Sequence, residues 1–228
     1  MTRFASLLIL AVVGTASAET LEDVQKTLAA KFEKHKSLTA DMKMSMHMGH
    51  GMSADSTGTV EFMIVNWKER FRSEMRMKMS HGPQTMETKI VNIYDGTDAY
   101  TISEMMGQKQ VAKTKPSQMA GRAGGKAFLE ELKREMNLKL LPDAKVGEAS
   151  TYVIEATPKQ ANPRTPGRMR YYFAKDTGIM MKMETLSPGG ETALTVTLTN
   201  IKMDPSLDPK RFEFTPEPGT NVLDMTGR

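Results

Sequence analysis

The most regular feature of the chain is an alternation of apolar and polar residues at every second position, which is typical of a half-buried β-strand. In residues 38–48 the even positions are apolar and mostly methionine, whereas the odd positions are mostly polar. Residues 70–79 repeat the pattern, with methionine at three odd positions and charged side chains at the even ones. Each segment therefore predicts a strand with one methionine-rich face.

The pattern elsewhere predicts two amphipathic helices and further strands. Residues 20–36 open with Thr20-Leu-Glu-Asp23, which resembles a capping box, and continue with apolar residues three and four positions apart. Residues 126–141 carry a second such stripe, which ends at Pro142. Residues 49–58 are predicted as a polar loop. The other predicted strands are residues 59–67, 86–94, 99–104, 107–113, 150–156, 168–174, 179–186, 192–203 and 211–215.

These elements predict a mainly β (α+β) fold with a single curved antiparallel sheet of about 11 strands. The strands of such a meander must bury one face, and the N-terminal helix and the central helix are available to cover it. No linker is long enough to divide the chain, so residues 19–228 are expected to form one domain.

The segment 1–18 has the features of a secretory signal peptide. Arg3 precedes an apolar segment at residues 4–13, and Ala16-Ser-Ala18 is an A-x-A cleavage site. We therefore expect cleavage before Glu19 and a periplasmic mature protein.

Composition and charge exclude several kinds of site. The absence of cysteine excludes disulfides, thiolate zinc sites, iron–sulfur clusters and a lipid-modified N-terminal cysteine. The formal net charge of +4 falls to +3 once Arg3 is removed, and this weak, evenly spread charge does not favour a nucleic-acid partner. The sequence contains no HExxH, G-x-S-x-G, P-loop or dinucleotide motif. We therefore expect neither an enzyme nor a cofactor.

The unusual number is 21 methionines against 14 aromatic residues (8 Phe, 5 Tyr and 1 Trp). Cores with one fixed packing favour branched and aromatic side chains, whereas flexible methionine suits surfaces that accommodate variable partners. The two methionine faces therefore indicate a lipid-binding cavity. An ordinary core that uses methionine, in a protein that acts as a ligand-free interaction module, is an alternative.

A second alternative is a copper site, because thioethers and imidazoles are the ligands that soft Cu(I) prefers. In an extended strand Met46 and Met48 lie on the face opposite His47, so these three cannot converge. The candidate ligands at the glycine-rich tip are Met48, His50 and Met52.

The order of elements and several motifs resemble the LolA/LolB-like superfamily of periplasmic lipoprotein carriers. The most specific pieces are Tyr94-Asp95-Gly96 followed by Tyr100, and Phe212-Glu-Phe-Thr-Pro216 followed by Gly219. The lack of a lipidation cysteine makes the chain similar to the soluble LolA-type carrier. The resemblance implies an incomplete barrel that holds lipoprotein acyl chains on its concave side, beneath a helical lid. It also implies a monomer that receives cargo from an inner-membrane donor complex and passes it to an outer-membrane acceptor.

The resemblance also implies a basic residue near the end of the second strand that latches the lid, and Lys68 and Arg70 occupy that stretch without the proline usual there. The lid is expected to hinge at Gly124-Gly125. Together the methionine faces and the resemblance predict a set of lipid-binding side chains on the sheet and under the lid: Met42, Met44, Met46, Phe71, Met75, Met77, Met79, Phe128, Leu132 and Met136.

Overall fold

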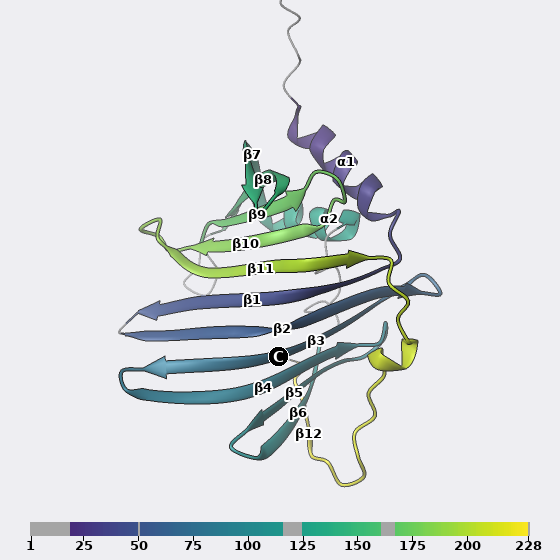
Figure 1. The fold of residues 1–228 in the computed structure, drawn as a ribbon, viewed down its shortest axis with the longest axis vertical. Coiled ribbons are helices and arrows are strands. Elements are labelled where there is room, and N and C mark those ends of the chain that lie inside the picture. Colours follow the sequence, from purple (N-terminus) through teal and green to yellow (C-terminus); the bar gives the residue numbers. More distant parts are fainter. Residues whose placement is uncertain (1–18, 50, 116–124, 161–166, 228) are drawn as a thin grey trace, which may run out of the picture.

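A computed structural model describes residues 19–49, 51–115, 125–160 and 167–227 (Figure 1). Its helices are α1 (Leu21–Phe32) and α2 (Gly125–Glu135), with a short 3-10 helix, η2 (Pro209–Phe212). The strands are β1 (Ser37–Gly49), β2 (Met52–Val65), β3 (Lys68–His81), β4 (Gln84–Tyr94), β5 (Ala99–Met105), β6 (Gln108–Thr114), β7 (Met136–Val146), β8 (Ala149–Pro158), β9 (Met169–Ala174), β10 (Met180–Leu186), β11 (Thr192–Met203) and β12 (Val222–Asp224).

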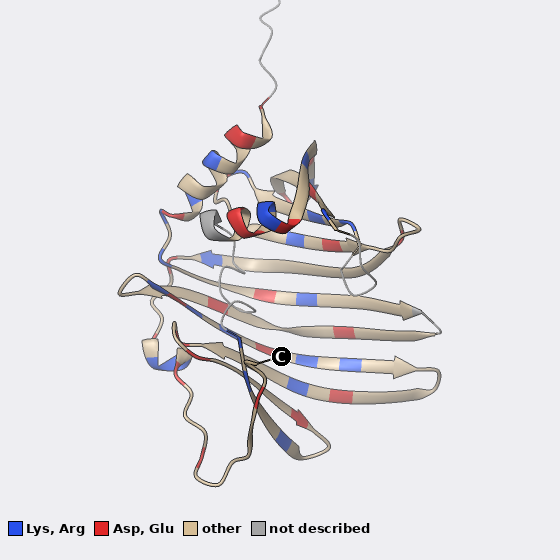
Figure 2. Ribbon diagram, turned by 180° about the vertical axis from the view of Figure 1, so that it is seen from behind, with Lys and Arg blue, Asp and Glu red and all other residues tan. Residues whose placement is uncertain are grey.

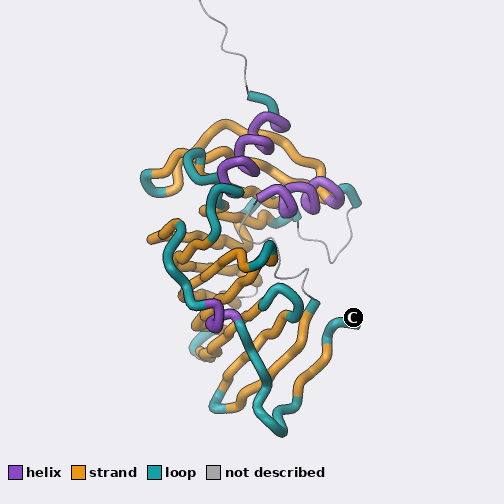
Figure 3. Tube along the Cα trace, turned by 90° about the vertical axis from the view of Figure 1, so that its right-hand side faces the viewer, coloured by secondary structure: helices purple, strands orange, loops and turns teal. Residues whose placement is uncertain are grey.

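All strands belong to one open sheet of twelve, in the order β12-β6-β5-β4-β3-β2-β1-β11-β10-β9-β8-β7. Every neighbouring pair is antiparallel except β12 and β6, which are parallel. Because β7 and β12 form two free edges, the barrel is incomplete, and the predicted fold class is confirmed. Figure 3 shows the sheet bending round toward the side on which both helices lie.

Strand pairing fixes which side chains share the face toward the helices, here called the helix-side face. Leu38, Phe62, Phe71 and Ala99 lie in one row across β1 to β5 and belong to a buried cluster with Phe32 of α1. Since side chains alternate along a strand, every second residue from these positions lies on the same face.

Helix α1 forms for the reason expected from its sequence. The Thr20 hydroxyl accepts a hydrogen bond from the Asp23 backbone N–H at 3.2 Å, and the Asp23 carboxylate accepts one from the Thr20 N–H at 3.2 Å. This capping box satisfies two of the N–H groups that a helix start leaves without partners. Val24 and Leu28 are buried on the apolar stripe of the helix.

The prediction that the second helix extends to residue 141 was wrong, because α2 ends at Glu135 and Met136 begins β7. Leu140 lies four residues after Met136 and so continues the helical stripe, but Leu138 and Leu140 also satisfy the alternation of a strand. They pair with Ala156 and Ile154 of β8, so sheet pairing decides the outcome. Pro142 falls where the register shifts between Leu141 and Ala144 and therefore removes no regular ladder bond.

Two further predictions were wrong. Residues 49–58 are not a loop: β2 begins at Met52, and its polar residues continue the ladder with β1 and β3. Residues 211–215 are not a strand, because η2 occupies their start. The chain after β11 instead passes over the face opposite the helices, where Phe212 is buried and the Phe214 ring contacts that of Tyr100 at 5.2 Å. It then forms β12, which the sequence pattern did not predict.

Candidate functional site

Six of the predicted methionines converge on the helix-side face, on two strands separated by β2. In strand register Met42 and Met75 flank Gly58, Met44 and Met77 flank Ser56, and Met46 and Met79 flank Ala54. These nine residues are called the methionine trough below. Thioethers therefore form the two walls, and the smallest side chains of β2 form the floor.

The floor residues are covered although they are small. Ser56 and Ala54 expose only 2% and 3% of their surfaces. The Ser56 hydroxyl donates to the Arg76 carbonyl oxygen at 3.2 Å, so its polar group is satisfied within the sheet. The walls are half-buried, except for Met79, which is 37% exposed. A flexible, apolar and incompletely buried surface of this kind suits a ligand that is itself apolar.

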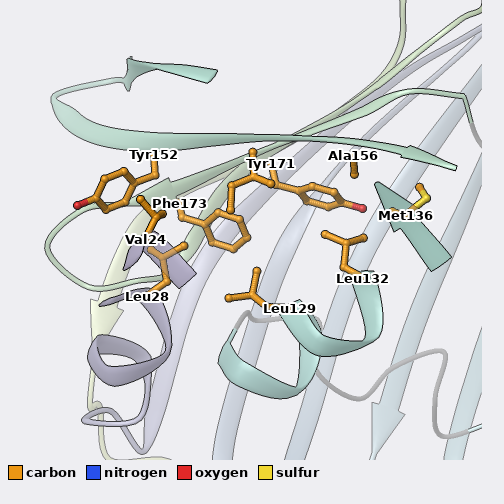
Figure 4. Packing of buried hydrophobic residues seen from close by; sticks show 10 residues of the cluster. Val24, Leu28, Leu129, Leu132, Met136, Tyr152, Ala156, Tyr171 and Phe173 are labelled. Atoms are coloured by element: carbon orange, nitrogen blue, oxygen red, sulfur yellow. The ribbon is translucent and has the colours of Figure 1, made fainter. Parts of the chain in front are cut away.

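The same face continues into a region covered by the helices. Val24 and Leu28 of α1 and Leu129 and Leu132 of α2 pack in one cluster with side chains of β8 and β9 (Figure 4). The Phe128 ring meets that of Tyr171 edge-on at 5.5 Å. Burial raises the pKa of Tyr171 to about 12, so its phenol stays neutral at physiological pH. Between this region and the trough, β11 contributes Leu194, Val196 and Leu198, which pair with the methionines of β1.

The other predicted lipid-binding residues lie in or beside this surface. Phe71 lies in the buried row at the α1 end of the trough, Phe128 and Leu132 belong to α2, and Met136 is in the helix-covered cluster. Met136 is placed there by β7 and not by the lid helix. The hinge position Gly124 lies outside the described residues, and Gly125 is the first residue of α2.

Lys68 and Arg70, the predicted lid latch, lie on the opposite face of the sheet from α2. The Lys68 ammonium donates to the Thr97 hydroxyl at 3.3 Å. Arg70 donates to the Pro209 carbonyl oxygen at 3.2 Å and lies 3.6 Å from the Glu213 carboxylate. In this structure Arg70 therefore holds the C-terminal segment and not the lid.

Along β11, β1 and β2 the face opposite the helices carries mainly charged and hydroxyl side chains, whereas on β4 and β6 the same face carries the buried Val91, Ile93 and Val111. Figure 2 shows bands of both acidic and basic residues along the long strands. A hollow of about 660 Å³ on this face is lined by charged residues that include Asp41, Glu61 and Arg211, together with threonines, Asn200 and a few apolar residues. Arg211 closes one side through bonds of 2.8 and 3.0 Å to Glu61. Such a lining does not suit an acyl chain, so the trough is the candidate site.

The structure changes the ligands available to copper. His50 lies outside the described residues, while Met48 and Met52 are exposed near the β1–β2 turn. Met52 pairs directly with His81 of β3, a residue that the sequence pattern did not single out. The sequence signal that could have found His81 is a spacing shared by residues 42–48 and 75–81. In each segment three methionines stand at every second position, and the next such position is Met48 in one segment and His81 in the other.

A polar row also went unpredicted. On the helix-side face Ser73, Asn92 and Thr101 lie side by side. Their row lies between the row of Met75 and the buried row that contains Phe71. The Asn92 amide donates to the Ser73 hydroxyl at 3.1 Å and accepts from the Thr101 hydroxyl at 2.8 Å. This row limits the apolar surface on its β4 and β5 side.

Sequence comparisons identify no relative: no protein-family model matches the chain, and no curated protein matches it. No helix among the described residues is long and apolar enough to cross a membrane.

Solved structures share the fold at low identity. An uncharacterized conserved protein from Thermus thermophilus is 10% identical, with a TM-score of 0.52 over 87% of this chain and 98% of its own. MucB in its complex with MucA from Pseudomonas aeruginosa is 13% identical, with a TM-score of 0.50 over 85% of this chain and 61% of its own. The chain thus spans about three fifths of that protein's length.

A putative outer membrane lipoprotein-sorting protein domain from Vibrio parahaemolyticus is 12% identical, with a TM-score of 0.40 over 83% of this chain and 94% of its own. The structures similar to this chain also include a LolA superfamily protein from Nitrosomonas europaea. What the chain shares with the Thermus protein and MucB is a fold, here an open, curved antiparallel sheet with helices on one face.

Proposed function

We propose that the protein is a periplasmic, non-enzymatic carrier that binds the acyl chains of lipoproteins or related lipids on the helix-side face and delivers them toward the outer membrane. The observation that carries the proposal is the methionine trough, an incompletely buried apolar surface continuous with a helix-covered one. The motif resemblance to LolA-type carriers supports the same function. So does the fold shared with MucB, a protein solved in complex with MucA, because that fold can present a binding surface.

The energetics of such a carrier follow from burial of hydrocarbon. Moving a CH₂ group out of water is worth about 0.8 kcal/mol, so a chain that buries roughly ten of them gains about 8 kcal/mol before binding costs. A methionine side chain changes its packing at little cost in free energy, because it is unbranched and flexible. The walls can therefore close over acyl chains of different shapes, and transfer to a more apolar acceptor needs no cofactor.

The test is uptake of a fluorescent fatty acid by the mature protein. In the variant M44D/M77D two carboxylates face the trough across Ser56, where desolvating a charge is costly. We expect uptake to be lost. M44Q/M77Q, which keeps the side-chain length and adds no charge, is expected to weaken uptake without loss of folding.

The matched control is T57D/T197D. Both threonines pair with Lys43 on the opposite face, so two new carboxylates there change the net charge equally and meet a basic neighbour. The control should bind the probe as the wild type does. Equal uptake by wild type, M44D/M77D and M44Q/M77Q would exclude the trough as the acyl site.

A further inference from the structure

The outer end of the methionine trough gathers soft metal ligands, and we propose that this rim binds one Cu(I) ion. The proposal does not rest on lipid binding, and two of its ligands, Met46 and Met79, also belong to the trough. The ligands share the helix-side face and lie around Ala54, in three neighbouring strands: Met46, Met52, Met79 and His81.

Strand pairing brings these side chains together. Met46 and Met79 both pair with Ala54, one from each side, and Met52 pairs directly with His81. Paired residues of antiparallel strands have Cβ atoms about 5 Å apart, and the strands two apart are separated by about 10 Å. Since Ala54 carries only a methyl group, the long thioethers of β1 and β3 can lean toward each other above it.

Three of the four rim ligands are exposed. Met52 and Met79 are 36% and 37% exposed and His81 is also exposed, whereas Met46 is half-buried like Met42, Met44, Met75 and Met77. An ion from solution therefore reaches the rim without moving the sheet. Leucine would fill any packing role of these exposed methionines equally well. Packing alone therefore does not explain why methionine stands at these positions.

The donor set selects the kind of metal. Thioether sulfur and imidazole nitrogen suit Cu(I), whereas calcium and magnesium prefer oxygen ligands. Within the described residues no three His, Cys, Asp or Glu side chains form a group that could hold a metal ion. The rim therefore offers neutral, soft ligands, which is the chemistry of a monovalent copper site.

The experiment is a Cu(I) titration of the mature protein under reductant, in competition with a chromogenic bicinchoninate chelator. X-ray absorption at the copper edge then identifies sulfur and nitrogen ligands. We expect one Cu(I) per chain, and we expect H81Q and M52L/M79L each to weaken binding by about tenfold or more, the size of effect that loss of even an outer-shell partner can produce.

Two controls separate the site from adventitious binding. His47 lies on the opposite face of β1, so H47Q should bind Cu(I) as the wild type does. M105L/M106L removes two exposed thioethers of the β5–β6 turn and should also leave binding unchanged. His81 is not one of the nine trough residues, so H81Q should still take up the fluorescent fatty acid. No stoichiometric copper, or equal affinities of H81Q and H47Q, would overturn the proposal.

Discussion

The floor of the trough depends on a close approach that only glycine permits, at Gly58. A Cβ atom built there would lie 1.9 Å from the Glu74 carbonyl oxygen and 2.8 Å from the Met75 Cα, both backbone atoms of β3. Ordinary van der Waals contact begins at 3.4 Å, so in Gly58→Ala the two strands must move apart locally. The obstacle is another strand's backbone, which no side-chain rotation relieves.

Forcing one extra methyl group into a packed region costs about 1–3 kcal/mol, and a displaced ladder bond adds about 1 kcal/mol. We therefore expect Gly58→Ala to lower the free energy of unfolding by about 3 kcal/mol. For a chain of this size that corresponds to a fall in Tm of about 6–12 °C.

The assay is urea unfolding followed by far-ultraviolet circular dichroism, with the midpoint and the slope compared between variants. Gly82→Ala is the control: at Gly82 no atom lies within 4 Å of the added Cβ, and only the positive φ of 57° opposes the substitution, at about 1 kcal/mol. A Gly58→Ala protein as stable as the wild type would refute the close approach of β2 and β3, and with it the geometry of the trough floor.

Three further predictions concern stability. Gln25 is 6% exposed and its amide has no hydrogen-bond partner among the described residues, so Gln25→Leu should stabilise the protein by about 1–3 kcal/mol in urea unfolding; a loss of stability would contradict this. Trp67 is held at φ 66° in the β2–β3 turn and is 98% exposed, so Trp67→Gly should raise the free energy of unfolding by about 1 kcal/mol, and an unchanged midpoint would show no strain there. Hydrogen bonds from His35 and the Lys36 N–H lower the pKa of Asp204 in the folded protein. The Asp204 carboxylate therefore stabilises the fold above about pH 4, and this stabilisation is lost as the pH falls through the lowered pKa. Asp204→Asn should reduce the loss of unfolding free energy at low pH, and an unchanged pH dependence would contradict this.

The sequence predicted those parts of the fold where local pattern and sheet pairing agree. The alternation in residues 38–48 and 70–79 placed six methionines on one face because a strand has a period of two and the register keeps that period across the sheet. Thr20 and Asp23 predicted the start of α1 for an equally local reason.

The rest depends on long-range pairing. Leu140 fits the helical stripe or a strand, and only its pairing with β8 decides between them. The small and polar residues at the start of β2 resemble a loop in sequence, because the place of Ala54, Ser56 and Gly58 as the trough floor is visible only once β1 and β3 flank them. Met52 begins β2 and His81 ends β3, so the whole hairpin separates them in sequence and no local pattern joins them. Strand β12 is too short to show a pattern of its own and is positioned by β6.

Native mass spectrometry of the mature protein purified from the periplasm tests most directly whether this protein carries an acyl ligand. We expect an adduct with the mass of a lipid or an acylated peptide in the wild type, and its loss in M44D/M77D but not in T57D/T197D. A bare polypeptide mass for the wild type, under conditions that preserve the lipid adduct of a known carrier, would contradict the proposed function.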